Sequence, residues 1–447
     1  MERTTELMLR DLSAQSEALA AGQTSSVALT RAQLEAIAAR PVLNAYLHVD
    51  AEGALRAAAE SDARRTAGLA LGPLDGLTLA VKDNIDVAAM PTTAGMATRR
   101  GRIAPADAFA VVRLRAAGMV VLGKLNMHEA ALGATNENPH YGRCENPHRA
   151  GYTPGGSSGG SASAVAAGLC ALALGSDTMG SVRIPAAYCG VVGLKASYGR
   201  VSTSGTVACS YVLDHVGPLT RSRRDLALVM PVLGVFDAAC ADARDLPRLP
   251  AKVAPRWVAA SDIESLGVSY PVAVAYRRAL QALRERGDEV CEIALRAYDF
   301  GRARRAGLLV VEADLLVEHA EDWRDRPELF SADLTRFMRY GEKQSAAAYA
   351  GAMRTIAAAH VEVARWFAQG DVMLLPTAPQ QAFAFGEPVP ANQADLTSIA
   401  NMAGLPALSV PLPVAEGELP IGLQLIAPIG AEATLLAADL NGICNKP

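Results

Sequence analysis

The feature that most constrains the fold is an alternation of short apolar runs with segments of helical periodicity. The runs LTLAV at 77–81 and MVVLG at 119–123 have the length of single buried strands. Between them, AFAVVRLRAAG at 108–118 has the pattern of a helix that ends at Gly118. Strands without a polar face need cover on both sides. We therefore expect an α/β fold in which helices cover both faces of a β-sheet.

The rest of the chain continues this pattern, with a change of character in its second half. Helical periodicity is clear over 5–21, 26–40 and 51–66. Residues 236–370 show long polar helices and few strand signals, so we interpret them as a variable helical region that selects the substrate. Further strands are expected at 170–175, 190–194, 289–293, 372–375, 407–411 and 422–426. The expected organisation is one domain over 1–447, with a catalytic core at 60–235, the helical region at 236–370 and sheet-completing strands at 371–447.

Composition excludes several classes of protein. Of 447 residues, 51% are hydrophobic and 20% are charged, which is typical of a globular chain. A formal charge of −4 without a basic stripe argues against nucleic acid as a partner. The charged start MERTTELMLRDLSAQS is neither a secretory signal nor a membrane anchor, and the longest apolar stretch, within 162–175, is too short to span a bilayer. We expect a cytoplasmic protein without a membrane partner.

The cysteines and histidines indicate no metal chemistry. Seven cysteines are an odd number and form no CxxC pair, which favours buried thiols in a reduced compartment. The seven histidines show no HExxH or other close metal-ligand spacing. We therefore expect neither a metal nor a cofactor.

The run YTPGGSSGGSASAVAAG at 152–168 could be a linker, a phosphate cradle or a catalytic loop. Gly/Ser runs alone favour a linker, but from Ser161 the chain reads as a buried helix that begins directly on the glycine loop. A P-loop would need Lys-Ser/Thr where this chain has Ser161-Ala162. Residues 156–160 match GxSxG, yet a loop precedes them in place of the strand that a nucleophile elbow requires.

Two other positions carry candidate chemistry. An apolar strand over 170–174 leads into a turn that contains Asp177, Gly180 and Ser181. Ser181 is either a solvated turn residue or a nucleophile that needs a base and oxyanion donors. Lys82 follows the strand 77–81 and is either a surface residue or a desolvated lysine that acts as a base.

Three separated motifs in order make the sequence recognisable. The segments VKDNI, GGSSGGSASAVAAG and DTMGSVRIPAAYCGVVGLK together closely resemble the amidase signature family. The resemblance extends along nearly the whole chain and includes DHVGPLTRSRRDLALV and ANMAGLPALSVPLPVAEGELPIGLQLIAP. It implies the fold of that family, a large mixed β-sheet with helices on both faces.

The resemblance also implies roles for individual residues. Ser181 would be the nucleophile, and Ser157, preceded by a cis peptide bond, would relay its proton to neutral Lys82. The oxyanion hole would consist of the backbone N–H groups of Thr178, Met179, Gly180 and Ser181. The substrate would face Ala131, Leu132, Gly133 and Ile184. The loops would be held by Ser158, Asp177 and Arg183.

Met179 departs from the family, which usually has two glycines before the nucleophile. If the backbone φ is positive there, a methionine costs about 1 kcal/mol or more. Its side chain could also narrow the substrate pocket. We therefore expect Met179 to affect the substrate range and the rate, and to leave the roles of the catalytic residues unchanged.

The expected activity is hydrolysis of the C–N bond of a small or medium carboxamide, through an acyl-enzyme, to a carboxylate and ammonia or an amine. The alternatives are a hydrolase of urea derivatives such as biuret and the glutaminase subunit of a tRNA-dependent amidotransferase. Ile184 is apolar where that subunit has a polar side chain, which disfavours the second alternative. The intact Lys82, Ser157 and Ser181 disfavour a non-catalytic subunit. A homodimer or a small accessory subunit is compatible with either activity.

Overall fold

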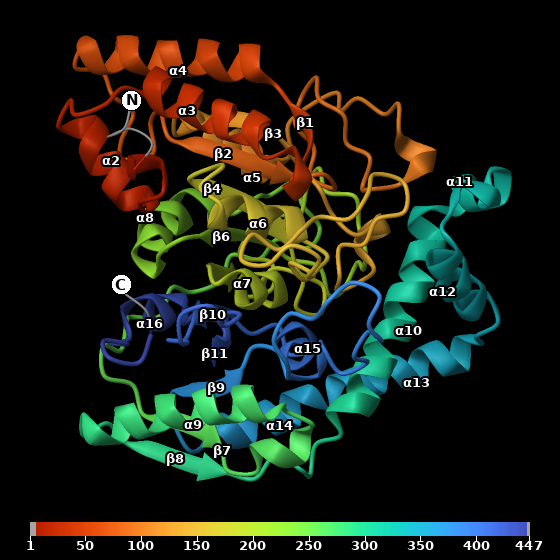
Figure 1. The fold of residues 1–447 in the computed structure, drawn as a ribbon. Coiled ribbons are helices and arrows are strands. Elements are labelled where there is room, and N and C mark those ends of the chain that lie inside the picture. Colours follow the sequence, from red (N-terminus) through yellow and green to blue (C-terminus); the bar gives the residue numbers. More distant parts are fainter. Residues whose placement is uncertain (1–5, 445–447) are drawn as a thin grey trace.

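A computed structural model describes residues 6–444, which are built around one mixed β-sheet (Figure 1). In this part of the chain the sheet has 11 strands in the order β1-β3-β2-β4-β6-β5-β10-β11-β9-β7-β8. The strands are β1 (Tyr46–Val49), β2 (Thr78–Lys82), β3 (Val120–Leu125), β4 (Leu172–Ser176), β5 (Val192–Lys195), β6 (Val216–Thr220), β7 (Trp257–Ala260), β8 (Val290–Ile293), β9 (Val372–Pro376), β10 (Ala407–Pro411) and β11 (Gly422–Ile426).

The strand directions divide the sheet into three parts. Strands β3, β2 and β4 are parallel, and so are β9, β7 and β8. The strands between these two groups pair antiparallel, as does β1 at one edge. Parallel strands need helical crossovers, whereas antiparallel strands can be joined without a helix, as β10 and β11 are. The expected large mixed sheet is confirmed.

Helices surround this sheet. They are α2 (Leu12–Ala20), α3 (Ser26–Ala39), α4 (Ala51–Thr66), α5 (Phe109–Ala116), α6 (Gly159–Ala166), α7 (Arg183–Cys189), α8 (Arg223–Leu233), α9 (Tyr270–Glu285), α10 (Phe300–Glu318), α11 (Ala320–Asp325), α12 (Ala332–Glu342), α13 (Ala346–Ala357), α14 (Ala359–Phe367), α15 (Asp395–Met402) and α16 (Glu432–Ala437). Helix α2 lies within the helix expected over 5–21, whose first residue is outside the described residues; Asp11 caps its N-terminus.

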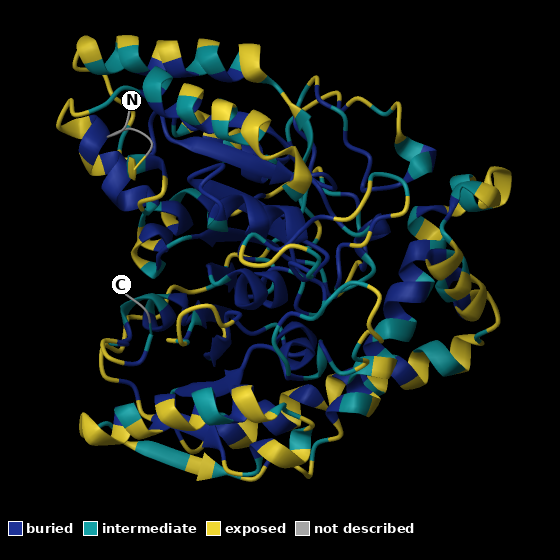
Figure 2. Cartoon of the chain, in the orientation of Figure 1, coloured by how far each residue is buried: buried dark blue, intermediate teal, exposed yellow. Residues whose placement is uncertain are grey.

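The sheet is apolar on both faces, and at β2 the two faces belong to different hydrophobic cores. Along β2, Leu79 and Val81 belong to one hydrophobic cluster and Ala80 to another, because successive side chains point to opposite faces. The first cluster includes residues of α5 and α8, and the second includes residues of α4, α6 and α7. Figure 2 shows the result: a buried sheet between helices whose outer surfaces are exposed. The expected helices on both faces of the sheet are confirmed, and at β2 each face packs against its own set of helices.

The region 236–370 contains helices α9 to α14 together with β7 and β8. Helix α10 packs against α12, α13 and α15, so this group of helices flanks the sheet, at the right of Figure 1. The strand expected at 289–293 is β8, and β7 pairs with both β8 and β9. The region therefore completes one edge of the sheet and also forms the helical flank.

Three strands (β1, β6 and β7) and four helices (α7, α8, α15 and α16) were not expected from the sequence. β1 is a half-exposed edge strand, and β7 spans only four residues. β6 contains Gly217 and Pro218, which are unfavourable within a strand. Helix α7 contains Pro185, but proline is tolerated in the first turn because its missing N–H has no partner there.

No helix among residues 6–444 combines the length and apolar character needed to cross a lipid bilayer.

The start of α6 depends on a close backbone approach at Gly160. A Cβ atom there would lie 2.4 Å from the carbonyl oxygen of Asn126 and 2.7 Å from that of Ala45. We expect Gly160→Ala to destabilise the protein by about 1–3 kcal/mol, as overpacking does, with a lower midpoint of urea unfolding.

Gly351 provides the matched control. It lies in α13, and a Cβ there would meet nothing within 4 Å. Gly351→Ala should stabilise by up to about 1 kcal/mol through helix propensity. An unfolding midpoint for Gly160→Ala equal to that of the wild type would show that the backbone contact is not restrictive.

Candidate active site

Two neighbouring parallel strands bring the candidate residues to one edge of the sheet. Lys82 is the last residue of β2, and Asp177 directly follows β4, its parallel neighbour. The carboxyl ends of parallel strands meet at the same edge, which is where α/β sheets place ligands. The glycine loop that ends in α6 lies over the same edge, since Ser158 bonds to Ser176 of β4. Lys82 and Ser157 are both fully buried.

The Lys82 amine is held between two serine hydroxyls. Its Nζ lies 2.7 Å from Oγ of Ser157 and 2.8 Å from Oγ of Ser176. Burial lowers the pKa of Lys82 to about 7, although the nearby Cys209, Asp214 and Asp177 act in the opposite direction. A lysine with this pKa is neutral in a large fraction of molecules at pH 7 and can accept a proton.

The glycine loop is fixed by short polar contacts. The Gly156–Ser157 peptide bond is cis, and the Ser157 carbonyl accepts a hydrogen bond from the His128 N–H at 3.2 Å. The Ser158 hydroxyl donates to the Ser176 carbonyl at 3.1 Å, and the Ser158 N–H donates to the Ser181 carbonyl at 3.2 Å. Ser158 therefore connects the glycine loop to β4 and to the loop that carries Ser181.

Asp177 organises the turn that contains Ser181. Its carboxylate accepts hydrogen bonds from the N–H groups of Gly180 at 2.8 Å and Val182 at 3.1 Å. Arg183 binds both carboxylate oxygens, each at 2.9 Å. Burial alone would raise the pKa of Asp177, but the Arg183 guanidinium holds it well below its usual range. The ionised carboxylate thus fixes the conformation of the turn by accepting hydrogen bonds from its N–H groups.

The backbone N–H groups of this turn divide into two sets. The N–H of Gly180 donates to Asp177, which differs from the expectation that it faces an oxyanion. The N–H groups of Thr178, Met179 and Ser181 have no acceptor among residues 6–444. Three of the four expected donors therefore remain available for a ligand.

Met179 is accommodated without backbone strain. It is absent from the non-glycine residues with positive φ, whereas Gly180 has φ 136°, and a Cβ there would lie 2.3 Å from Oγ1 of Thr397. The Met179 side chain reaches α10, where a Cβ on Gly307 would lie 2.8 Å from its sulfur. Of positions 179 and 180, where the family usually has two glycines, only position 180 requires glycine in this structure. Gly307 leaves space for the Met179 side chain.

An apolar cavity of about 160 Å³ lies against these loops. All four residues expected to face the substrate line it, and so do Thr178, Met179 and Ser181. No charged side chain is among its lining residues, which are Ala131, Leu132, Gly133, Ala134, Gly156, Thr178, Met179, Ser181, Ile184, Cys209, Leu308, Val311, Phe337 and Ala394.

Sequence reasoning missed part of this lining and some of its support. Leu308 and Val311 come from α10 and Phe337 from α12, far along the chain from the motifs. The only signal for these residues in the sequence is the polar helical character of 236–370, which we interpret as a region that selects the substrate. Asp214 was also missed: it accepts a hydrogen bond from the Thr178 hydroxyl at 2.6 Å, and burial raises its pKa to about 6.

The other titratable residues add two observations. Among residues 6–444, no group of three or more His, Cys, Asp or Glu side chains could hold a metal ion. The seven cysteines are free thiols, but Cys240, Cys291 and Cys444 are only half-buried, unlike the buried thiols that we expected.

Comparisons with known proteins identify the family of this chain. The family model named Amidase matches residues 28–436. One of the relatives is a glutamyl-tRNA(Gln) amidotransferase subunit of Roseiflexus castenholzii. It is 40% identical, and the alignment covers 94% of this chain and 92% of that protein.

Solved structures give the same result. The peptide amidase of Stenotrophomonas maltophilia is 29% identical with a TM-score of 0.83, over 96% of this chain and 95% of that one. A protein from a vestigial complex that reveals the evolutionary origins of an s-triazine catabolic enzyme is 34% identical with a TM-score of 0.89, over 98% and 99% of the two chains. The chain therefore belongs to the amidase signature family and is an enzyme that hydrolyses amide C–N bonds.

Proposed function

We propose that this enzyme hydrolyses a small or medium uncharged carboxamide to a carboxylate and ammonia or an amine. One observation carries the proposal: a buried Lys82 amine with a pKa of about 7 lies 2.7 Å from Ser157, beside an apolar cavity lined by Ser181.

Acylation begins with proton transfer. Ser181 Oγ attacks the amide carbon, its proton passes to Ser157, and the Ser157 proton passes to neutral Lys82. The N–H groups of Thr178, Met179 and Ser181 stabilise the negative charge on the carbonyl oxygen. When the tetrahedral intermediate collapses, the same route returns a proton to the leaving nitrogen, because an amide anion is a poor leaving group. Water then attacks the acyl-enzyme along the same route and releases the carboxylate.

The substrate class follows from the cavity. Its side chains are apolar apart from a few hydroxyls and a thiol, and no cation or carboxylate lines it. An α-amino acid would bring an ammonium and a carboxylate into this space, where neither would find an opposite charge. A neutral aliphatic or aromatic acyl group fits both the volume and the chemistry.

A second candidate is the glutaminase subunit of a tRNA-dependent amidotransferase. It is favoured by the 40% identity to a glutamyl-tRNA(Gln) amidotransferase subunit. The uncharged lining of the cavity, Ile184 included, argues against free glutamine as the substrate. If the second candidate is right, a partner protein would have to supply the missing charges. A urea derivative such as biuret remains compatible with the cavity, because it is small and neutral.

Ser181 should become covalently modified by a fluorophosphonate. Intact mass spectrometry is expected to show one adduct on the wild-type protein and none on Ser181→Ala, because the hydroxyl is the acceptor. Ser265→Ala, at an exposed position, is the control and should be modified like the wild type. An adduct on Ser158 in place of Ser181 would assign the nucleophile to the glycine loop.

Activity should fall on the acid side as Lys82 becomes protonated. Since only the neutral amine accepts a proton, kcat/KM is expected to rise with pH through about 7 and to be largely lost at pH 5. Lys82→Ala should reduce kcat by about 10²–10⁴-fold or more, whereas the exposed Lys343→Ala should leave it unchanged. A wild-type profile that is flat down to pH 5 would contradict a neutral lysine base.

Ammonia release should distinguish the candidate substrates. In a screen of aliphatic, aromatic and urea-type amides together with glutamine, we expect neutral carboxamides to be the best substrates. One methylene in an apolar pocket is worth only about 1–3 kcal/mol, so selectivity among close analogues should be modest. Glutamine as the best substrate, or activity only with an added partner protein, would favour the amidotransferase candidate.

A further inference from the structure

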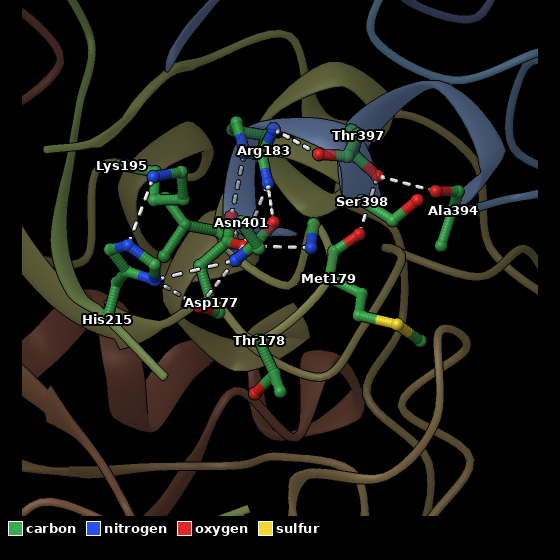
Figure 3. A network of polar contacts seen from close by, with 12 residues as sticks. Asp177, Thr178, Met179, Arg183, Lys195, His215, Ala394, Thr397, Ser398 and Asn401 are labelled. Carbon is green, nitrogen blue, oxygen red and sulfur yellow. Dashed lines mark hydrogen bonds and ion pairs between the residues drawn. The ribbon is translucent and has the colours of Figure 1, made fainter. Parts of the chain in front are cut away.

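A network of buried polar contacts surrounds Asp177, next to the turn that carries Ser181 (Figure 3). Lys195, the last residue of β5, and His215, directly before β6, are both buried and were given no role above. Nζ of Lys195 lies 3.1 Å from Nε2 of His215 and donates to the Ala196 carbonyl at 2.9 Å. Nδ1 of His215 lies 2.8 Å from the Leu213 carbonyl and 3.2 Å from that of Asp177.

These neighbours determine which nitrogen of His215 carries the proton. Nδ1 faces two carbonyl oxygens, which only accept hydrogen bonds, so Nδ1 must be the donor. The amide nitrogen of Asn401 is also near Nδ1, but it lies farther away, at 3.5 Å, and already donates to Asp177. Nε2 is then the acceptor, and Lys195 is the group that donates to it.

The surroundings lower the pKa of both residues. Burial lowers the pKa of His215 and that of Lys195 well below their ordinary values. A charge on Lys195 lowers the pKa of His215 further, and the nearby Arg183 acts in the same direction on both. Asp177 opposes the shift on both residues, and Glu432 opposes it on Lys195. The Lys195 amine has two acceptors within hydrogen-bonding distance, the Ala196 carbonyl and His215 Nε2.

The acceptor at the end of this chain is the peptide unit that joins Asp177 to Thr178. The Asp177 carbonyl accepts hydrogen bonds from the His215 N–H at 3.1 Å, from His215 Nδ1 at 3.2 Å and from Asn401 Nδ2 at 3.0 Å. The N–H at the other side of the same planar unit belongs to Thr178, which has no acceptor among residues 6–444. Because the peptide is planar, fixing its oxygen fixes the direction of its N–H.

The Ser181 N–H is anchored in the same manner. The carbonyl of its peptide unit, that of Gly180, accepts a hydrogen bond from the Ile184 N–H at 2.7 Å. Hydrogen bonds to a carbonyl also polarise the amide and strengthen the donor at its other end. Two N–H groups beside the cavity are thus held by contacts to their carbonyls. For Thr178 those contacts come from His215 and Asn401.

We propose that Lys195 and His215 are positioning residues for amide hydrolysis: Lys195 fixes the tautomer of His215, and His215 holds the Asp177–Thr178 peptide so that the Thr178 N–H faces the oxyanion. This proposal rests on the proposed function, since it assigns the N–H a role in that reaction. Neither residue touches the substrate. Their effect should therefore appear in the transition state rather than in substrate binding.

The tautomer can be measured directly in the wild-type protein. In histidine labelled with ¹⁵N, the chemical shifts of the two ring nitrogens distinguish Nδ1–H from Nε2–H, and His215→Gln identifies the signal. We expect His215 to be neutral with its proton on Nδ1. A proton on Nε2, or on both nitrogens at pH 7, would overturn the proposal. This measurement needs no substrate, so it remains decisive even if the proposed activity is not found.

Kinetics test the consequence for catalysis. Lys195→Met keeps the length of the side chain but removes the donor to Nε2. We expect kcat to fall by about 10- to 100-fold with KM within twofold, because weakening one oxyanion donor costs somewhat less than removing it. The affinity for an alkyl boronic acid, which forms a tetrahedral adduct with the nucleophile, should fall by the same factor. Lys252→Met, at a largely exposed position, is the matched control and should change neither quantity.

The outcomes separate positioning from a purely structural role. Loss of stability with unchanged kcat and unchanged boronate affinity would show that the pair only supports the fold, and this would overturn the proposal. A loss confined to KM would do the same. If Lys195→Met does not fold, the tautomer of His215 in the wild-type protein decides whether the proposal stands. A wild-type protein without amidase activity would contradict the proposed function, whereas the tautomer measurement would still test the contacts of the pair.

Discussion

The ion pair between Asp177 and Arg183 is the interaction on which the site depends. Both side chains are fully buried, and the guanidinium binds both carboxylate oxygens. The remaining donors of Arg183 reach the Thr397 carbonyl at 2.9 Å, and Gln424 Oε1 and Asn401 Oδ1 at 2.5 Å each. A buried charge pair is tolerable only when its hydrogen-bonding capacity is used in this way, and removal of one partner typically costs about 3–5 kcal/mol.

This pair also connects two distant segments of the chain at one site. Asp177 and Arg183 follow β4, whereas Asn401 lies on α15 and Gln424 on β11, more than two hundred residues later. In the sheet, β4 and β11 are separated by β6, β5 and β10, so the contacts cross the antiparallel centre. The turn that carries Ser181 is therefore held in part by residues of the C-terminal segment. The parallel strands position the candidate reactive groups, and contacts across the antiparallel centre connect their turn to the last part of the chain.

The sequence predicts the fold class and the reactive residues because both are encoded locally. Strands such as β2 and β4 are short apolar runs, and Lys82, Ser157 and Ser181 lie in contiguous motifs. Strand β6 was not predicted because Gly217 and Pro218 interrupt its apolar pattern. In the structure, its neighbours β4 and β5 provide its pairing partners.

Contacts between distant segments could not be predicted in the same way. The cavity wall from α10 and α12 depends on how helices dock, which no local pattern encodes. The same holds for Lys195 and His215: both lie in segments that resemble the family, but their pairing exists only because β5 and β6 are neighbours in the sheet. The pattern of apolar residues predicts elements, and the fold decides which polar residues meet.

Met179 shows how such a distant contact shapes the chemistry. A side chain before Gly180 adds bulk to the wall of the cavity, and this bulk needs space near the facing helix. Gly307 of α10 leaves that space, since a Cβ there would lie 2.8 Å from the methionine sulfur. The catalytic turn and the helical flank are thus fitted to each other. Because the backbone of Met179 is unstrained, a methionine at this position is compatible with free N–H groups in the turn, and its side chain lines the cavity.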